Sequence, residues 1–317
     1  MPLEPRVRRL VALSNVLDRG GPGPQTILTQ REASAAQSHR LGFLAMAHGP
    51  KMVEEVDRLI PVAGGQIRVR IHRPRRSGAP LPLYLFVHGG GWCLGTLEER
   101  DPRCREIASG ADCIVASVEY RLAPENAYPV ATEDCYAALV WLHDHAEELG
   151  IDSGRIAIGG ESAGGNLAAV VCLMARDRGG PALCHQWLDV PAVDLTLAQP
   201  AFSEVPDGYL LDRDAVLEFR ELYLVDVALD HEPYASPLLA SSHEGLPPAW
   251  IMSAEFDKLR DDGKAYAAAL EAAGVPVEYQ MLRGHIHGSF AFTRMIASAK
   301  AYEVAAIAAL AKAFANA

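Results

Sequence analysis

Short apolar runs alternate with longer stretches in which apolar residues recur at helical spacing, and this alternation covers most of the chain. The short runs are bounded by turn residues and have the composition of strands. They span residues 66–72, 81–87, 113–118, 155–158, 185–190, 249–253 and 277–282. The main helical patterns lie at residues 132–149, 163–176, 262–273 and 297–315. Strands that alternate with helices predict an α/β fold around a largely parallel sheet.

Two segments do not follow this alternation. One is residues 1–50, with a helical pattern at residues 30–47, and the other is residues 197–234, between two predicted strands. Asp212 is placed to cap a helix in the second segment, where apolar residues recur on one face. These residues are Ala215, Val216, Phe219, Leu222 and Tyr223. A helix at this place predicts a lid over the ligand-binding end of the sheet, and the alternative is a longer crossover packed on the sheet face.

Composition and charge narrow the class of protein. The chain has 317 residues, of which 50% are hydrophobic and 22% charged, as in an ordinary soluble globular protein. Its formal net charge of -11 has the wrong sign for a nucleic-acid partner. The longest apolar runs, residues 167–175 and 304–311, are shorter than the roughly 18 residues of a membrane span. No long apolar block follows the N-terminal arginines, so we expect a cytoplasmic location.

The six cysteines are scattered along the chain, and no two of them form a C-x-x-C pair. Cys113 and Cys172 stand in apolar runs, where cysteine behaves as a small core residue. Because cytosolic proteins seldom keep disulfides, we expect reduced thiols.

A serine flanked by glycines follows one of the predicted strands. Gly160, Ser162 and Gly164 form the pattern G-x-S-x-G between an apolar strand and a helical segment, which is the pattern of a nucleophile elbow. The turn is so sharp that a side chain at either flank would collide with the neighbouring strand or helix. A serine hydroxyl at such a turn still needs a base and a group that stabilises the oxyanion.

A glycine run after another strand is a candidate for stabilising the oxyanion. Residues 88–92 read His-Gly-Gly-Gly-Trp directly after the apolar run 81–87. Backbone N–H groups of Gly89 and Gly90 can turn toward a ligand there, and the helix-start amide of Ala163 can join them. A plain glycine turn and a phosphate loop are the alternatives, and the residues fit neither of the usual phosphate-binding glycine patterns.

The base and its orienting acid are expected downstream of the serine. Asp257 and His287 each follow a predicted strand, at the sheet edge where open α/β folds place their ligands. Asp257 competes with the nearby acids Glu255, Asp261 and Asp262. His285 and His287 together could suggest zinc, but no matching cysteine or carboxylate spacing accompanies them, so we expect no metal.

Together these motifs resemble the hormone-sensitive-lipase-like branch of the α/β-hydrolase superfamily, the esterases related to bacterial carboxylesterases and arylacetamide deacetylase. The resemblance begins near residue 60 and is carried by ordered blocks at residues 88–92, 120–125, 160–165, 235–238, 246–248 and 257–263. It implies an α/β-hydrolase fold, with a mostly parallel central sheet flanked by helices and a helical cap. We expect residues 51–196 and 235–317 to form the core, and residues 1–50 and 197–234 the cap.

The resemblance also implies a role for each motif residue. Ser162 would be the nucleophile, His287 the general base and acid, and Asp257 the carboxylate that orients the histidine. The oxyanion-hole amides would come from Gly89, Gly90 and Ala163. His287 is preferred to His285 because the histidine of the family precedes a glycine, as His287 precedes Gly288.

Two residues depart from the family's pattern. Ser289 stands where an aromatic residue usually follows the glycine, and Lys258 replaces a proline that is common after the acid. Glu161 stands where the family often has aspartate and would support the elbow. Structural roles are expected for His88, for Tyr120 and for a pair of Arg121 with Glu125. Candidates for the substrate pocket are Trp92, Tyr209 and Leu210.

The expected activity is that of a serine carboxylesterase, acting on short to medium acyl esters or aryl acetates through an acyl-enzyme. Its partner would be a small-molecule ester, with no cofactor, and a homodimer through the last strand and C-terminal helix is a further expectation. Because histidine acts as a base only when neutral, activity should fall as the pH drops through about 6.5.

Other activities remain open at this point. Hydrolysis of lactones or amides, or acyl transfer to an alcohol, would use the same serine, histidine and aspartate. A receptor that binds a small ligand without turnover is the alternative from a different class, and the presence of all three residues argues against it.

Overall fold

The computed structural model describes residues 2–18, 27, 29, 31 and 49–317. Within these ranges the strands form one eight-stranded sheet in the order β1-β2-β4-β3-β5-β6-β7-β8. Their bounds are β1 Glu54–Val62, β2 Gly65–Arg73, β3 Leu81–Val87, β4 Ile114–Glu119, β5 Ile151–Glu161, β6 His185–Asp189, β7 Ala249–Phe256 and β8 Val277–Ile286. Strands β1, β2 and β4 pair antiparallel, and the remaining neighbours pair parallel. The mostly parallel sheet is therefore confirmed.

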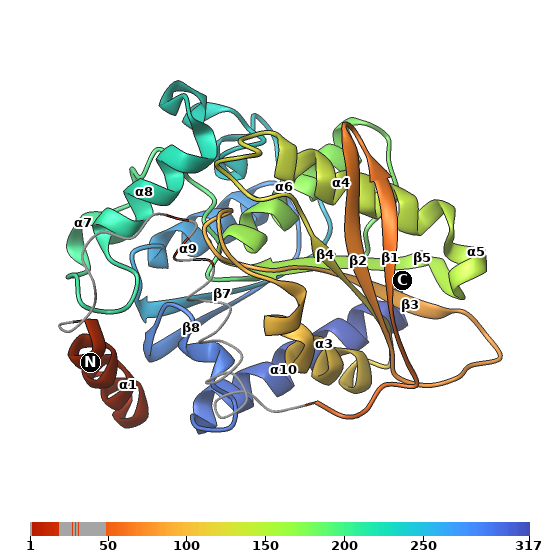
Figure 1. Ribbon diagram of the computed structural model, residues 1–317, viewed down its shortest axis with the longest axis horizontal. Helices are drawn as coiled ribbons and strands as arrows, with labels where there is room; N and C mark the ends of the chain where they lie inside the picture. Colours follow the sequence, from red (N-terminus) through yellow and green to blue (C-terminus); the bar gives the residue numbers. More distant parts are fainter. Residues whose placement is uncertain (1, 19–26, 28, 30, 32–48) are drawn as a thin grey trace.

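Helices cover both faces of this sheet. Their bounds are α1 Pro5–Asp18, α3 Leu97–Gly110, α4 Val130–Asp144, α5 Ala146–Leu149, α6 Ala163–Asp177, α7 Ala201–Glu204, α8 Arg213–Leu224, α9 Arg260–Ala272 and α10 Ala297–Asn316, with short 3₁₀ helices η1 Val227–His231, η2 Pro237–Leu239 and η3 Ser289–Ala291. Helices α3 and α10 pack on one face, and α4, α6 and α9 pack on the other (Figure 1). Three layers of this kind define an α/β fold.

The central strands are buried on both faces, which explains their unbroken apolar runs. Every residue of β3 is buried, and alternate residues belong to different cores. Leu83 and Leu85 lie in the core under α4, α6 and α9, whereas Tyr84 and Phe86 lie in the core under α3 and α10. A strand with two apolar faces leaves its carboxyl end as the place for polar side chains.

All the predicted strands are present, with ends that differ by a few residues. Strand β1 was missed, because it is an edge strand of which only Ile60 is fully buried, so its sequence lacks a clear apolar run. Helix α3 was missed for a similar reason: Glu, Asp and Arg side chains occupy much of it, and Pro102 lies inside it. Both elements contact β2, since β1 pairs with it in the sheet and α3 packs on it.

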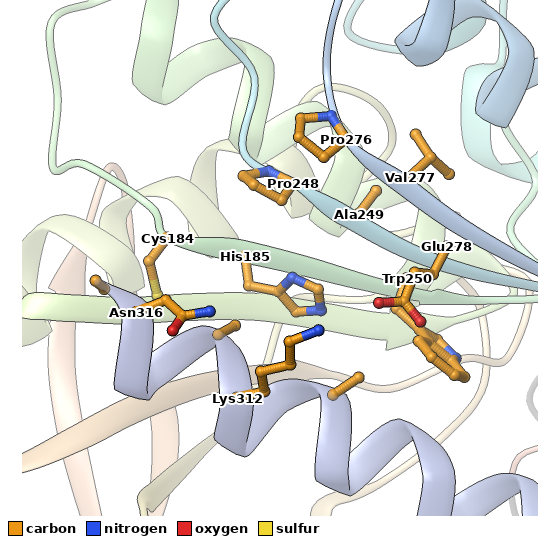
Figure 2. A pocket seen from close by; sticks show the side chains of 13 residues that line it. Cys184, His185, Pro248, Ala249, Trp250, Pro276, Val277, Glu278, Lys312 and Asn316 are labelled. Atoms are coloured by element: carbon orange, nitrogen blue, oxygen red, sulfur yellow. The ribbon is translucent and has the colours of Figure 1, made fainter.

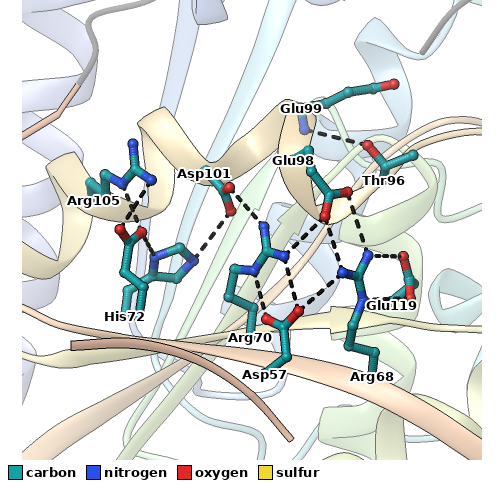
Figure 3. A network of polar contacts seen from close by, with 11 residues as sticks. Asp57, Arg68, Arg70, His72, Thr96, Glu98, Glu99, Asp101, Arg105 and Glu119 are labelled. Atoms are coloured by element: carbon teal, nitrogen blue, oxygen red, sulfur yellow. Dashed lines mark hydrogen bonds and ion pairs between the residues drawn. The ribbon is translucent and has the colours of Figure 1, made fainter. Parts of the chain in front are cut away.

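Charged side chains tie α3 to the outer strands (Figure 3). Arg70 of β2 contacts Asp57 of β1 at 2.7 Å, Asp101 at 2.8 Å and Glu98 at 2.9 Å. Arg68 contacts the same Asp57 at 3.0 Å and Glu98 at 3.1 Å. Helix α3 therefore joins this ion network on one side, while Cys104, Ile107 and Ala108 pack in the core on the other.

Two expectations about helices need correction, and a third is not tested. The single helix expected at residues 132–149 is divided into α4 and α5 at His145. Asp212 does occupy the N-cap position of α8, but its side chain accepts from the N–H of Gly208, and the Arg213 N–H donates to Asp207 instead. The helical pattern at residues 30–47 lies outside the described residues except for Arg31, and the N-terminal helix that the structure describes is α1.

All six cysteines are free thiols, and each is buried except Cys184, which is half-buried. In the described ranges, no helix combines the length and apolar character needed to cross a membrane.

Candidate active site

Ser162 lies at a sharp turn between the end of β5 and the start of α6. Its φ of 55° and ψ of -121° are strained for a residue with a side chain. A Cβ atom on Gly160 would lie 2.4 Å from the carbonyl oxygen of Val87, and one on Gly164 would lie 2.1 Å from the same oxygen. Glycine at both flanks therefore lets strand, turn and helix approach closely and leaves the serine side chain at the sheet edge.

The structure brings the three motif residues into one hydrogen-bond chain. His287 Nε2 lies 3.0 Å from Ser162 Oγ, and His287 Nδ1 lies 2.7 Å from Asp257 Oδ2. The other carboxylate oxygen of Asp257 accepts the N–H of Leu259 at 2.9 Å. Because a carboxylate only accepts, Nδ1 carries the proton and Nε2 is free to accept the serine proton.

Burial and charge set the titration of this histidine. Burial lowers the pKa of His287, but the charge of Asp257 and the hydrogen bond to it outweigh that effect and raise the pKa above its ordinary 6.5. The Asp257 side chain is fully buried, so water does not screen the pair. An imidazole whose positive form is favoured is well suited to receive a proton from serine.

Among the acids near the end of β7, Asp257 is the one bonded to His287. Asp261 pairs with Arg260 at 2.8 Å, and Asp262 accepts the backbone N–H groups of Val193 and Asp194. Glu255 accepts the N–H of Gly284 at 2.7 Å. These acids fix loops around the site, and Asp257 alone among the four reaches the imidazole.

Both ring nitrogens of His285 are bonded to serines other than Ser162. Its ring nitrogens contact Ser289 Oγ at 2.9 Å and Ser298 Oγ at 2.8 Å. Over the described ranges, no group of histidine, cysteine and carboxylate side chains could hold a metal ion.

The glycine run packs directly against the serine turn. A Cβ on Gly89 would lie 2.7 Å from the backbone oxygen of Glu161 and 3.3 Å from Ser162 Cβ, so this glycine touches the elbow. Gly90 has a φ of 126°, which only glycine adopts readily. Ala163 is the first residue of α6, so its N–H has no partner within that helix. Gly89 therefore lies directly against the serine turn, and Ala163 follows Ser162 at the start of α6.

The His88 side chain contacts the glycine run and is itself held by Tyr120. Its ring stacks on Tyr120 at 4.3 Å, Nδ1 lies 2.9 Å from the Gly89 carbonyl oxygen, and the Tyr120 hydroxyl donates to the His88 carbonyl at 3.0 Å. Complete burial lowers the pKa of His88 to about 4. A neutral ring in this place has a structural role, as expected from the sequence.

Glu161 is anchored by arginines of α3. It pairs with Arg100, and with Arg103 at 2.8 Å, while Arg103 also pairs with Asp189 at the end of β6. Burial would raise the pKa of Glu161, but Arg100 and Arg103 lower it to about 2. The carboxylate is thus permanently charged and paired, in line with a supporting role for the elbow.

The expected pair of Arg121 with Glu125 is wrong. Arg121 pairs with Asp134 of α4 at 2.6 Å, and Glu125 pairs with Arg31 at 2.6 Å. Both partners, Asp134 and Arg31, lie outside the local motif, so spacing along the chain could not identify them.

Helix α8 packs on the glycine run and lies beyond the carboxyl ends of the strands (Figure 1). A Cβ on Gly91 would lie 2.4 Å from the ring of Phe219, and Trp92 stacks on Tyr223 at 4.5 Å. This position favours a lid over a crossover packed on the sheet face.

The three pocket candidates differ in their surroundings. Trp92 is buried against α8, and Tyr209 packs on Phe256, one residue before Asp257, at 5.3 Å. Leu210 is 48% exposed.

A cavity of about 470 Å³ lies elsewhere, where β6, β7 and β8 begin next to the C-terminal half of α10 (Figure 2). Its lining includes His185, Trp250, Glu278 and Lys312. Because Ser162, Asp257 and His287 follow the opposite ends of the strands, this cavity is separate from their site.

Comparison with known proteins identifies the family. Residues 84–291 match a family described as having the alpha/beta hydrolase fold. Carboxylic ester hydrolase LipN of Mycobacterium tuberculosis is 42% identical over 293 residues, which cover 90% of this chain and 76% of the relative. The chain belongs to the hormone-sensitive-lipase-like branch of the α/β hydrolases.

Other members of this α/β-hydrolase branch agree in sequence and structure. The arylesterase of Saccharolobus solfataricus is 36% identical, over 90% of this chain and 92% of the relative. A hyperthermophilic esterase from Pyrobaculum calidifontis has a TM-score of 0.92 at 37% identity, covering 98% of this chain and 99% of that one. The thermophilic carboxylesterase EstE1 from a metagenomic library has a TM-score of 0.87 at 37% identity, over 92% and 98% of the two chains.

Proposed function

We propose that this protein is a serine carboxylesterase that works through an acyl-enzyme on Ser162. The observation that carries the proposal is the hydrogen-bond chain from Ser162 through His287 to buried Asp257. The relatives are named as ester hydrolases, and this protein is likewise a carboxylic ester hydrolase.

The reaction follows from the roles of these groups. His287 Nε2 takes the proton of Ser162 as Oγ bonds to the ester carbonyl carbon, and the carbonyl oxygen becomes negative. The N–H groups of Gly89, Gly90 and Ala163 bind this oxyanion. The bond to the alcohol oxygen then breaks, and the alcohol leaves with the proton from His287. Water repeats the sequence, and the acid is released.

The cap restricts the substrate in this proposal. Residues 51–196 and 235–317 form the catalytic core, and residues 1–50 and 197–234 form the cap. Phe219 against Gly91 and Tyr223 against Trp92 bring helix α8 onto the oxyanion loop, which supports a confined acyl pocket and a preference for short to medium acyl esters or aryl acetates. Trp92, Tyr209 and Leu210 are the residues we propose for the pocket.

The other activities are less well supported. Relatives are named as carboxylesterase, arylesterase and ethyl acetate hydrolase, which favours esters over amides or lactones and hydrolysis over acyl transfer. A receptor without turnover does not need a serine bonded to a buried histidine and aspartate pair.

Two further parts of the proposal concern the protein in the cell. A cytoplasmic location is supported by the six free thiols, which a reducing compartment preserves. A homodimer through β8 and α10 is supported by the position of β8 at the edge of the sheet.

The test is hydrolysis of p-nitrophenyl esters of increasing acyl length. Wild-type protein should turn over the short esters, and Ser162→Ala should lose about 10⁴-fold to 10⁶-fold in kcat. Ser117→Ala, a buried serine of β4, is the matched control and should keep wild-type activity. Equal activity of wild-type protein and Ser162→Ala would contradict the proposal.

A further inference from the structure

Ser289 departs from the family's pattern, and the structure shows what its hydroxyl does. Ser289 Oγ lies 2.9 Å from the carbonyl oxygen of Ile286, 3.2 Å from the Ile286 nitrogen and 2.9 Å from His285 Nδ1. The Ser289 side chain is fully buried, as is Ile286. One hydroxyl therefore satisfies both backbone polar groups of the residue that precedes His287.

The direction of each hydrogen bond is determined by the number of protons. A carbonyl oxygen only accepts, so the single proton of Ser289 goes to Ile286. Ser289 Oγ must then accept from the Ile286 N–H and from His285, which places the proton of His285 on Nδ1. Burial lowers the pKa of His285, so the ring is neutral and Nε2 accepts from Ser298 Oγ at 2.8 Å.

This defines a chain of hydrogen bonds that we name the α10 relay: Ser298 at the start of α10, His285, Ser289 and the backbone of Ile286. Ser289 uses its one proton and both of its lone pairs in it. The relay joins a helix packed on the sheet to the turn that carries His287.

The backbone of Ile286 controls where His287 lies. Ile286 pairs with Phe256 in the register of β7 and β8, and this is the last pair of the two strands. The next residue on each strand is His287 on one and Asp257 on the other. The Ile286 side chain lies in a buried apolar cluster with Val7 of α1 and Ala299 of α10, so packing also holds the residue in place. A shift of Ile286 would move the imidazole relative to both Asp257 and Ser162.

We propose that Ser289 and His285 are positioning residues for His287. Their hydrogen bonds hold Ile286 in place and so keep the His287 imidazole in line between Asp257 and Ser162. Ile286 is fully buried, so loss of the Ser289 hydroxyl would remove these bonds from backbone groups that water does not reach. The inference rests on the proposed function, because it assigns these residues to the reaction of His287.

The first variant removes the hydroxyl. Ser289→Ala should lower kcat by about tenfold to a hundredfold, because small displacements of a catalytic group are costly, with KM nearly unchanged. A looser pair of His287 with Asp257 also loses the effect that raises the pKa of His287. The fall of kcat/KM toward low pH, here called the acid limb, should therefore have its midpoint at a lower pH than in the wild type. A purely structural residue would not cause this shift.

Two variants of His285 distinguish the effect of its hydrogen bond from the effect of its volume. His285→Asn places an amide N–H close to the position of Nδ1, and it should keep kcat within about threefold of wild type. His285→Leu fills the space without a donor and should lower kcat by about tenfold. Ser298→Ala is the matched control, because it leaves His285 Nε2 unpaired but keeps all bonds to Ile286. It should lower the melting temperature with kcat close to wild type.

Three results would overturn the proposal. The first is a Ser289→Ala variant with the kcat and the low-pH fall in rate of the wild type. The second is an equal loss of kcat in His285→Asn and His285→Leu, and the third is a loss of kcat that is proportional to the loss of melting temperature in every variant. Wild-type turnover that is abolished in Ser162→Ala is the reference for every variant. A failure of the proposed function would appear in that reference, and a failure of the relay would appear in Ser289→Ala alone.

Discussion

Two ionic clusters flank Ser162, and they are built for different purposes. On one side, Glu161 and Asp189 are paired with Arg103, and all three side chains are buried. On the other, Asp257 is buried but its partner is His287, which keeps 16% of its side chain exposed. Both clusters hold carboxylates at the ends of neighbouring strands.

The difference lies in what each cluster can do with a proton. Arginine holds its charge at every working pH, so the pair of Glu161 with Arg103 stays ionised and rigid. Asp257 raises the pKa of His287 above its ordinary 6.5, but an imidazole, unlike a guanidinium, can still gain and lose a proton during a reaction. One cluster fixes the elbow, and the other performs the chemistry. Substitutions in the two should therefore separate stability from activity.

The largest effect is expected from the acid of the reactive cluster. Asp257→Asn keeps the shape but favours the wrong tautomer of His287, so kcat should fall about 10⁴-fold, with little change in unfolding free energy. Steady-state kinetics and urea unfolding measure the two quantities. Asp261→Asn, an acid of the same loop that pairs with Arg260, is the control and should keep kcat. A loss of activity in Asp261→Asn equal to that in Asp257→Asn would break the assignment.

The opposite pattern is expected for the structural cluster. Glu161→Gln breaks a buried pair with two arginines, so the free energy of unfolding should fall by about 3–5 kcal/mol. At temperatures where the variant is folded, kcat/KM should fall by no more than about tenfold. Urea unfolding and ester kinetics on the same preparation decide between the outcomes. Full stability with a thousandfold loss of activity would place Glu161 in the reaction.

The pH profile sharpens the same contrast. His287 acts as a base only when neutral, and its pKa is raised, so kcat/KM should fall toward low pH with a midpoint above 6.5. Below that midpoint the rate should drop about tenfold per pH unit, as for one proton. Glu161→Gln should keep the slope of this fall but move its midpoint slightly to lower pH, because the charge of Glu161 also raises the pKa of His287, by less than Asp257 does. A midpoint below 6.5 in the wild type would contradict the pairing with Asp257.

The smallest effect concerns the cap. Phe219→Ala removes the ring that covers Gly91, and KM for the longer acyl esters should change by about threefold to tenfold, with kcat on acetate nearly constant. Glu218→Ala, on the exposed side of the same helix, should leave KM unchanged. A uniform loss on all esters would indicate that α8 supports the oxyanion loop rather than the acyl pocket.

Much of the fold follows from local patterns. Central strands such as β3 are buried on both faces, and their apolar runs mark them in the sequence. Strand β1 and helix α3 were not predicted because charged residues interrupt their apolar positions, and Arg70 contacts acids of both elements. From sequence alone a charged residue is predicted to be exposed, because the partner that would allow its burial is not known.

The site divides in the same way. The glycine pattern marks Ser162, and chain order puts the acid and the base downstream of it. The choice of Asp257 and His287 among their neighbours came from the resemblance to the family. The partners of Arg121 and Glu125 could not be predicted, because Asp134 and Arg31 are distant in the chain. The relay of Ser289 and His285 was visible only as a departure from the family's pattern. Its role depends on the contacts of Ser289 with His285 and Ile286, which the sequence does not reveal.

The central claim is that Ser162 forms a covalent acyl-enzyme. The most direct test is the mass of the protein after treatment with a p-nitrophenyl alkylphosphonate, which traps an activated serine and releases p-nitrophenol. We predict one adduct per chain, on the peptide that contains Ser162, absent in Ser162→Ala and formed more slowly in Asp257→Asn. An adduct on another residue, or continued ester hydrolysis after full labelling of Ser162, would contradict the account.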